Sequence, residues 1–397
     1  MLPRARRLPA VILGLTLATA GAAKVNILGY WWENPLPYQE VPKGLRSLRA
    51  SECGVCHQEI YREWKLSTHA HALADLQFQE EIKKSPSSAW LCMNCHTPLE
   101  NQSPTITVGV EERSTSRPIV RENPRFDPAL REEAITCAVC HVRDGVILGP
   151  YGDSRAPHPV RKDPKLLTEE ICAACHQATA AYSDTLVCTF NTAAEWRESH
   201  HARDGKTCSS CHMPEVERPI AVGAKPRPSR RHYFIGSKIP KVMDVPEELR
   251  EAYKLFPSGL TVEIADPRAR RGRVEVDLRL KNALAGHMLP TGDPERFIRI
   301  DVYLRSQGRV LEKRSIKIGQ EWEWWPAARK LSDNRLKPGE DRTETVRFSA
   351  AAWGGVSVEA VVFNVRLTEE NARYHNLLGR YPLEAEVLRI RPPGAAW

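Results

Sequence analysis

The sequence predicts an α plus β multidomain protein, in which a mostly helical or irregular domain precedes an antiparallel Ig-like β-sandwich. Three observations lead to this fold class. The chain has 397 residues, which is too long for one ordinary hydrophobic core. Every cysteine lies within residues 51–213. From about residue 258 onward there is no cysteine, and apolar and charged residues alternate with period 2, as in antiparallel strands.

The first 23 residues are typical of a signal peptide. Arg4, Arg6 and Arg7 precede an apolar stretch, Leu8 to Ala23, that ends in small residues. This stretch is shorter than the ~20 residues of a membrane span, although an uncleaved N-terminal anchor is the alternative interpretation. The mature protein is therefore expected to be periplasmic or extracellular. Residues 24–50, rich in proline and aromatics, are expected to form an extended arm on a domain surface.

The charge of the chain does not indicate nucleic-acid binding. The formal net charge is +8, and loss of the leader with its three arginines lowers it to +5. The remaining lysines and arginines are scattered along the chain, whereas nucleic-acid-binding proteins gather them on one face or element.

The cysteine-rich domain is predicted to span residues 51–245. Helices are expected at 56–82, 126–141, 166–180 and 191–202, separated by irregular connections rich in Pro, Gly and Arg. Residues 214–245 are expected to be a loop, followed by a short helix at 246–256 that begins at Pro246.

The β-sandwich is predicted to span residues 258–397. Its strands are expected where alternating segments lie between Gly, Pro and Asn turns: 273–282, 296–306, 309–319, 343–350, 357–367 and 383–391. We expect this domain to serve as a structural or docking module.

The motif Cys-x-x-Cys-His occurs five times and uses ten of the eleven cysteines. Two cysteines three residues apart can each form a thioether with one vinyl group of the same haem, and the next histidine supplies the proximal ligand to iron. The pattern predicts five covalently bound haem c groups. The cysteines are Cys53, Cys56, Cys92, Cys95, Cys137, Cys140, Cys172, Cys175, Cys208 and Cys211, and the proximal ligands are His57, His96, His141, His176 and His212.

Zinc sites and redox-active disulfides are the alternative interpretations of these cysteine pairs. Structural zinc takes four ligands, usually from two pairs, so five pairs leave one unmatched. Neither alternative explains a histidine directly after every second cysteine. The five haem sites fall within 160 residues, so neighbouring haems are expected to touch or nearly touch. Cys188 remains outside the motifs, in an apolar segment, and is expected to be a buried thiol.

Eight histidines lie outside the motifs, enough to supply a second axial ligand to every iron. An internal repeat selects two of them. Residues 64–70 and 196–202 share the pattern Trp-x-x-Ser-x-His-Ala, which aligns His69 with His201. The predicted distal ligands are His69, His158, His201, His232 and His287.

The remaining predictions for these histidines depend on their surroundings. His158 lies between two prolines in a rigid loop, and His232 follows two arginines that could pair with haem propionates. His287 lies in a turn between two predicted strands and is the weakest candidate. The other three, His71, His200 and His375, are expected to be non-ligands, with His375 on the surface. Methionine is the alternative distal ligand, and a predominance of histidine implies low reduction potentials.

These motifs resemble those of the cytochrome c554-like multihaem proteins. The resemblance covers roughly residues 50–235 and depends on segments such as CGVCHQEIYREWKLSTHAHA, WLCMNCHTPLENQ and ITCAVCHVRDGVILGP. The NALAGHMLPTG segment resembles, more weakly, the C-terminal sandwich attached to some of these cytochromes. The resemblance implies electron transfer through bis-histidine haems, with His69, His158, His201 and His232 as distal ligands. The fifth motif and the added sandwich depart from the tetrahaem pattern, which leaves haem order and redox partner open.

The leading functional hypothesis is an exported electron carrier or conduit whose irons are all six-coordinate. One alternative is a multihaem enzyme that reduces a nitrogen or sulfur oxyanion at an open iron, with no catalytic residue assigned. The other is a subunit of an extracellular cytochrome filament. Redox proteins are the expected partners, in a membrane-associated or extracellular complex, and homo-oligomerisation is left open.

Overall fold

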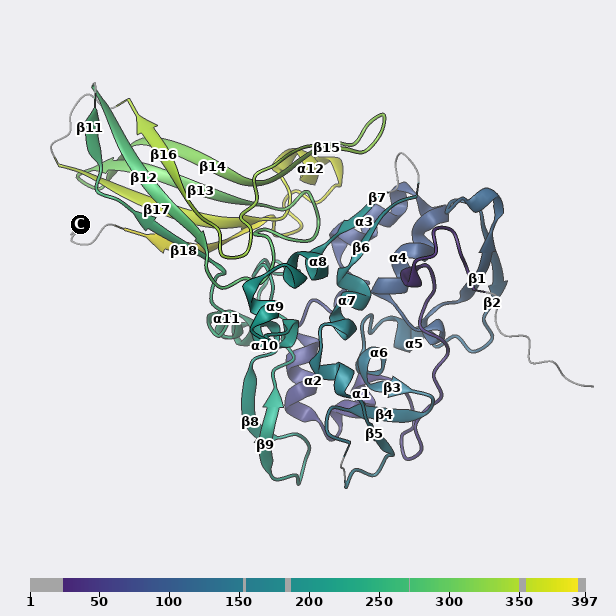
Figure 1. Cartoon of the computed structure of the whole chain (residues 1–397). Coiled ribbons are helices and arrows are strands. Elements are labelled where there is room, and N and C mark those ends of the chain that lie inside the picture. The colour runs from purple at the N-terminus through teal and green to yellow at the C-terminus, as the bar shows by residue number, and fades with distance from the viewer. Residues whose placement is uncertain (1–23, 153–154, 183–186, 271, 350–354, 392–397) are drawn as a thin grey trace, which may run out of the picture.

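The computed structural model describes residues 24–152, 155–182, 187–270, 272–349 and 355–391. The predicted signal peptide therefore lies outside the described residues. Figure 1 shows the cysteine-rich part of the chain at one end of the molecule and strands β11–β18 at the other. No helix among the described residues is long and apolar enough to cross a bilayer.

Short helices and turns make up the cysteine-rich part. The α-helices before the strand-rich part are α1 (Ala50–Gly54), α2 (Gln58–Lys65), α3 (Leu76–Lys84), α4 (Ala89–His96), α5 (Pro128–Arg131), α6 (Cys137–His141), α7 (Glu170–His176), α8 (Thr192–Arg197), α9 (His200–Arg203), α10 (Cys208–His212) and α11 (Glu247–Lys254). Short 3-10 segments lie at Trp31–Glu33, Pro86–Ser88, Glu100–Gln102, Glu111–Arg113 and Pro164–Leu167. The helical structure predicted at 56–82 and 126–141 is present as pairs of shorter helices, α2 with α3 and α5 with α6, separated by turns.

Small β-ribbons connect these helices. They comprise β1 (Thr105–Val110) with β2 (Pro118–Glu122), β3 (Val142–Arg143) with β4 (Val146–Gly149) and β5 (Val160–Lys162), β6 (Ala178–Ala181) with β7 (Val187–Phe190), and β8 (Glu215–Pro219) with β9 (Pro226–Arg230). The prediction of a simple loop over 214–245 was wrong, because β8 and β9 pair antiparallel there. Pro219 pairs with Pro226 at the end of that pairing next to the connecting turn, a placement that an edge strand tolerates.

Two sheets form the strand-rich part. In the first sheet β12 (Arg273–Asn282) pairs with β10 (Leu260–Ile264), β11 (Arg268–Arg270) and β16 (Asp341–Phe348). The second has the order β15 (Arg329–Asp333), β14 (Arg309–Glu323), β13 (Phe297–Ser306), β17 (Val356–Val365), β18 (Glu384–Ile390). The helix α12 (Glu369–Tyr374) lies between β17 and β18 in the chain. All these strand pairings are antiparallel. Five of the six predicted strands lie within about two residues of their predicted ends, and the sixth, β14, extends from the predicted 309–319 to residue 323.

One apolar cluster joins the two sheets. Alternate residues of β12, such as Val276 and Leu278, pack with Ile300 and Leu304 of β13 and with Phe348 of β16, and all are nearly or fully buried. This pattern is the physical reason for the period of 2 in the sequence, since successive side chains of a strand point to opposite faces.

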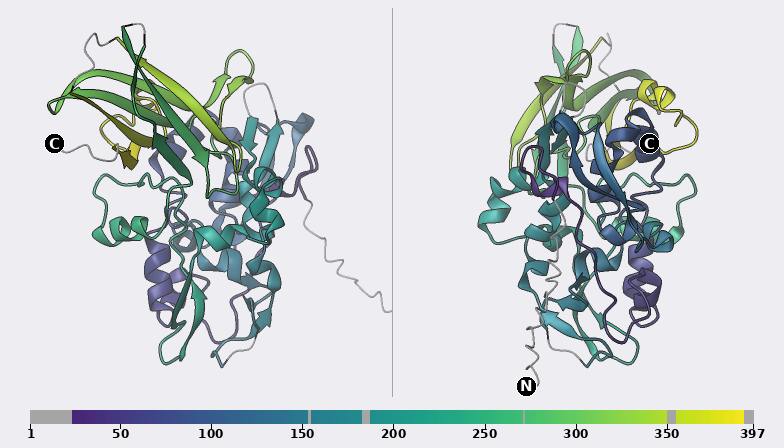
Figure 2. Two further views of the ribbon diagram at one scale, coloured as in Figure 1. Left: turned by 60° about the vertical axis from the view of Figure 1, so that its left-hand side comes forward. Right: turned by 90° about the vertical axis from the view of Figure 1, so that its right-hand side faces the viewer.

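The cysteine-rich and strand-rich parts contact each other through polar side chains. Asp75, just before α3, accepts hydrogen bonds from the hydroxyl of Tyr381 at 2.8 and 2.9 Å and forms an ion pair with Lys241. Arg366, directly after β17, donates to the carbonyls of Ile239 and Pro240. The views in Figure 2 show the strands lying over the helices of the cysteine-rich part. The loop between β12 and β13, which carries His287, reaches α8 across this contact.

Candidate haem sites

Each Cys-x-x-Cys-His motif lies on a helical turn. The motif forms the whole of α6 and α10 and the C-terminal turn of α4 and α7. The first motif begins at the end of α1, and the backbone N–H of His57 donates to the carbonyl of Cys53 at 2.9 Å, so the turn is helical there too. Residues i, i+3 and i+4 share one face of a helix. The spacing therefore directs both thiols and the imidazole of each motif to the same side, as attachment of one haem requires.

Backbone carbonyls fix the orientation of most of these imidazoles. The Nδ1 atoms of the motif histidines lie close to carbonyl oxygens, at 2.6 Å for His57, 2.8 Å for His96, 3.0 Å for His141 and 2.7 Å for His212. A carbonyl can only accept, so Nδ1 carries the proton and Nε2 keeps its lone pair. This arrangement is the usual support for a metal-bound histidine, and it fits a proximal ligand to haem iron.

Three histidine pairs have the spacing expected of two ligands on opposite sides of one iron. A metal–nitrogen bond of about 2 Å and about 1.2 Å from that nitrogen to the ring centre would separate the ring centres by about 6.3 Å. The observed separations are 6.3 Å for His69 with His176, 6.5 Å for His141 with His232, and 6.2 Å for His212 with His287. Of these distal candidates, His232 and His287 also have Nδ1 within 2.9 Å of a carbonyl oxygen.

Burial keeps these imidazoles neutral. Desolvation lowers the pKa of His69 to about 3 and the pKa values of His176 and His232 to about 4, with a smaller decrease for His287. Only the neutral imidazole has a free lone pair for iron. The donor set, ring spacing and protonation state therefore fit covalently attached haem c, which supplies reversible one-electron oxidation and reduction when it is bound.

His158 lies near the first motif. Burial lowers its pKa, and the charge of His57 lowers it further, which marks the two rings as neighbours. The Nδ1 atom of His158 is buried without a hydrogen-bond partner among the described residues. His158 thus has the surroundings of a ligand to the first haem, and its role stays a prediction.

The second motif has a different environment. The ring of Phe78, from α3, stacks on His96 with a centroid distance of 3.6 Å and an interplanar angle of 5°. Among the described residues no imidazole lies opposite His96 at the spacing of the three pairs. The fifth predicted distal ligand, His201, lies elsewhere: its ring contacts His200 at 4.0 Å and packs against Gly286. Both ring nitrogens of His201 are buried without partners in the described structure, and its assignment as a ligand stays a prediction.

The prediction that His375 lies on the surface was wrong. Its ring is only 3% exposed, because α12 packs against α3. The Nε2 atom lies 3.2 Å from the Nζ atom of Lys84 and 3.3 Å from a carboxylate oxygen of Glu81. Glu295 completes a cluster in which one potential ligand atom from each of Glu81, Glu295 and His375 lies within 4.8 Å of the others. The ammonium group of Lys84 already provides a cation at this cluster.

Thiols of different motifs lie in contact, which indicates how the motifs are ordered in space. The Cys53 thiol lies against Cys137, Cys95 against Cys175, and Cys172 against Cys208, and each pair shifts the pKa values of its two thiols. The first motif therefore adjoins the third, the second adjoins the fourth, and the fourth adjoins the fifth. Cys188 is half-buried, and desolvation raises the pKa of its thiol to about 12.

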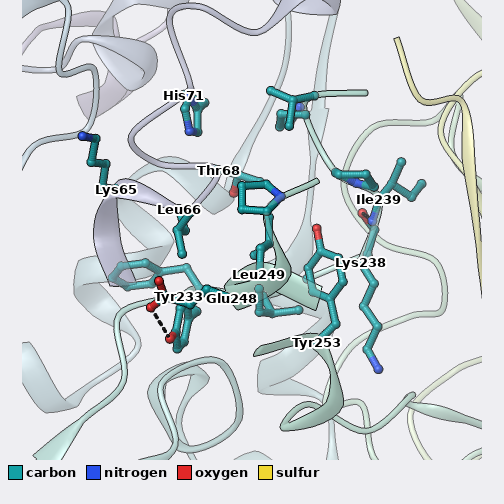
Figure 3. Close-up of a pocket in the computed structure, with 18 of the residues that line it drawn as sticks. Lys65, Leu66, Thr68, His71, Tyr233, Lys238, Ile239, Glu248, Leu249 and Tyr253 are labelled. Carbon is teal, nitrogen blue, oxygen red and sulfur yellow. Dashed lines mark hydrogen bonds between the residues drawn. The ribbon is translucent and has the colours of Figure 1, made fainter. Parts of the chain in front are cut away.

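A cavity of about 510 Å³ lies beside the distal histidines (Figure 3). It is bounded by α2, the segment 233–242 and α11, and a hydrogen bond of 3.3 Å from Tyr233 to Glu248 closes one side. No residue of a Cys-x-x-Cys-His motif lines it. Phe234, in its wall, also contacts the rings of His69 and His232 at 4.4 and 5.6 Å. The cavity is therefore separate from the Cys-x-x-Cys-His motifs, and one ring, that of Phe234, lies between it and two predicted distal ligands.

Two buried carboxylates were missed by the sequence predictions. Glu63 and Glu195 are 2% and 7% exposed, and each accepts a hydrogen bond from a backbone N–H at or next to a distal histidine. A signal was present in the sequence, because each glutamate directly precedes the tryptophan of the internal repeat.

Residues 52–142 match the sequence model of a family described as cytochrome c554 and c-prime. This range includes the first three motifs. The match and the structural comparison below support a multihaem c-type cytochrome with covalently bound haem c and a role in electron transfer or redox chemistry. No curated protein matches the chain.

The fold is similar to that of a penta-heme cytochrome c552 from Thermochromatium tepidum. The TM-score is 0.58 at 15% sequence identity, and the alignment covers 87% of this chain and 98% of that chain. The sporulation control protein Spo0M from Bacillus subtilis aligns with 34% of this chain and 48% of its own at 10% identity, with a TM-score of only 0.15.

Proposed function

We propose that this chain is a five-haem electron relay. The observation that carries the proposal is the 6.2–6.5 Å spacing of three buried histidine pairs, each formed by one motif histidine and one histidine from a distant segment. Iron held by two imidazoles has no open position for a substrate, and it changes oxidation state with little rearrangement. The five motifs, and the fold shared with a penta-heme cytochrome, support five such groups.

The thiol contacts support an order of haems. Contacts of the fourth motif with the second and fifth, through Cys175 and Cys172, make its haem the junction. Haems attached at adjoining motifs lie close together, and short edge-to-edge distances allow fast electron tunnelling. Electrons would pass between the second and fifth haems through the fourth, and directly between the first and third haems.

The other parts of the chain suit an exported carrier. We propose that residues 1–23 direct export and that the relay exchanges electrons with redox proteins in the periplasm or outside the cell. Residues 24–50 would be its N-terminal arm and residues 51–245 its haem domain. The two sheets that share one apolar cluster would form an Ig-like sandwich within residues 258–397. In the relay that sandwich would contribute His287 to the fifth haem.

Spin-state measurements on the purified protein test the proposal. Low-temperature electron paramagnetic resonance should show low-spin ferric iron at the three paired sites, and the pyridine haemochrome assay should give five haems per chain. A majority of high-spin iron, or fewer than four haems, would contradict the relay.

The environment of His96 favours a second candidate function, reduction of a small nitrogen or sulfur oxyanion at one open iron. Among the described residues, no second imidazole is paired with His96 at the 6.2–6.5 Å spacing of the other three pairs. An enzyme of this kind would show about one fifth of its iron as high-spin and reactive with carbon monoxide. A His96 haem that is low-spin and inert to carbon monoxide would remove this candidate and leave the relay.

A further inference from the structure

The internal repeat is longer than its histidine pattern indicates. Residues 63–70 read EWKLSTHA and residues 195–202 read EWRESHHA, so both contain Glu-Trp-x-x-Ser-x-His-Ala. The two copies are also alike in structure. The serine hydroxyl accepts from the backbone N–H three residues later in both, at 3.4 Å for Ser67 and 3.2 Å for Ser199. The glutamates, Glu63 and Glu195, are both buried.

Glu63 is bonded to the segment that carries His232. One carboxylate oxygen accepts the backbone N–H of His232 at 2.8 Å. The guanidinium of Arg218 binds both oxygens, at 2.7 and 3.0 Å, and Arg231 binds one at 2.7 Å. His232 is the residue whose ring lies 6.5 Å from His141. The carboxylate is thus fixed by two arginines and in turn fixes the backbone of a distal histidine.

Glu195 has the same relation to the segment that carries His287. One oxygen accepts the backbone N–H of Met288 at 3.2 Å and the hydroxyl of Thr291 at 2.6 Å, while Arg335 binds the other at 2.8 Å. The carbonyl of Met288 lies 2.8 Å from Nδ1 of His287. The ring of His287 lies 6.2 Å from His212. A buried carboxylate therefore again connects an arginine to the backbone beside a distal histidine.

The two ligand segments have nothing else in common. His232 follows a β-ribbon, β8–β9, and His287 lies between two long strands, β12 and β13, of which only β12 belongs to the first sheet. Both histidines lie outside helices and strands, where no ladder of hydrogen bonds fixes the backbone. A buried ion pair alone would be weak evidence for any role. Here the glutamate of each repeat copy accepts a hydrogen bond from the backbone at or next to a predicted distal ligand, which indicates a positioning role.

We propose that Glu63 and Glu195 are positioning residues that hold His232 and His287 in place as distal ligands of the third and fifth haems. The proposal rests on the proposed relay, since it assumes that these histidines bind iron. Each carboxylate can accept from the backbone and from arginine at once. An amide cannot, because its NH₂ group would face either a guanidinium or a backbone N–H.

The test compares four single variants of the haem-loaded protein. Glu63→Gln and Glu195→Gln should each convert about one iron in five from low-spin to high-spin in electron paramagnetic resonance, with a matching gain in carbon monoxide binding. Added imidazole should restore the low-spin signal. Glu217→Gln, on β8 beside Arg218, and Glu198→Gln, directly after α8, serve as controls, because both glutamates are exposed, and they should leave the spectrum unchanged.

A double variant separates positioning from charge balance. Glu195→Gln with Arg335→Gln removes the arginine, which also pairs with Asp333, together with the carboxylate. If Glu195 only neutralises Arg335, the double variant should return to low-spin iron; if it positions His287, the iron should stay high-spin. Low-spin iron in the double variant would overturn the proposal for this site.

The possible outcomes distinguish failure of this inference from failure of the proposed function. High-spin iron at the third and fifth haems of the unmodified protein would reject the relay itself. Low-spin iron there, unchanged in both glutamine variants, would overturn the inference and leave the relay intact. If the glutamine variants do not accumulate, Thr291→Val removes one donor to Glu195 and should raise the high-spin fraction about fivefold, as expected for one lost hydrogen bond. An unchanged fraction in that variant would also overturn the inference.

Discussion

The strand-rich and cysteine-rich parts of the molecule differ in where their cores come from. In the strand-rich part, one cluster of seventeen buried apolar residues joins both sheets. In the cysteine-rich part, apolar clusters of four to six buried residues lie apart from one another, separated by motif cysteines and histidines. The difference indicates that the strands carry their own core, whereas the short helices are built around the space that haem fills.

The contact between the two parts differs from both of these cores, because charged and hydrogen-bonded side chains form it. Asp75, Lys241 and Tyr381 form one buried network across it, and Arg366 lies over the ring of Tyr381 at 4.4 Å. Buried polar networks of this type are costly when one member is lost. The stability of each part and of their contact can therefore be tested separately.

The largest effect should come from withholding haem. A chain made without haem attachment should lose protected structure over residues 24–245 and keep it over residues 258–391, because only the second region has a continuous apolar core. Hydrogen exchange followed by mass spectrometry measures this directly, with the haem-loaded protein as the control. Equal protection of both regions without haem would break the comparison.

The polar contact gives the next effect. Asp75→Ala leaves Lys241 buried without its partner and removes the acceptor of the Tyr381 hydroxyl, so we expect a loss of about 3–5 kcal/mol in unfolding free energy. The two parts should then unfold in separate steps, followed by haem absorbance and by circular dichroism in the far ultraviolet. Asp75→Asn is the matched control for the helix cap, since its side chain can still accept from the N–H of Phe78. A single, unshifted transition in Asp75→Ala would contradict this account.

The same difference explains how far the sequence could predict the fold. Strands such as β12 and β13 were predicted almost to the residue, because their apolar residues alternate with polar ones and the apolar ones all face one shared core. The sequence indicated helical structure over 56–82 but not the turns at residues 66–74, which separate the short helices α2 and α3. The ring pairs of His69 and His232 with motif histidines could not be derived from spacing, because each joins segments far apart in the chain.

A truncation in the shared core should act on one part only. Leu278 is fully buried between the sheets, and Leu278→Ala should cost about 2–5 kcal/mol, the sum of lost apolar burial and the remaining cavity. The haem spectrum should not change, because no motif histidine contacts β12. Unfolding followed by far-ultraviolet circular dichroism measures the loss, and Leu284→Ala, at a residue 46% exposed, is the control. A shift in spin state would show that the core and the haem sites are coupled more tightly than the comparison implies.

The smallest effect concerns pH and the contact near α12. Burial and, to a lesser degree, the nearby carboxylates of Asp293 and Glu81 raise the pKa of Glu295 to about 7, against Lys84 and a hydrogen bond from Asn371. In the unfolded chain the same group titrates near 4.5. Between pH 4.5 and pH 7, Glu295 therefore keeps its proton in the folded protein and loses it in the unfolded chain. This contribution to stability is complete below pH 4.5 and is lost as pH rises through 7.

Glu295→Gln isolates that contribution. The amide keeps the shape of the protonated acid and its contact with Asn371, so the variant should match the unmodified protein near pH 5 and exceed it above pH 7, by at most about 3 kcal/mol. Thermal unfolding at a series of pH values measures the difference, and Glu369→Gln on α12, whose side chain is 69% exposed, should show none. Parallel profiles for Glu295→Gln and the unmodified protein would mean that water reaches this carboxylate, and that the contact between the two parts is more open than its buried neighbours His375 and Asp75 indicate.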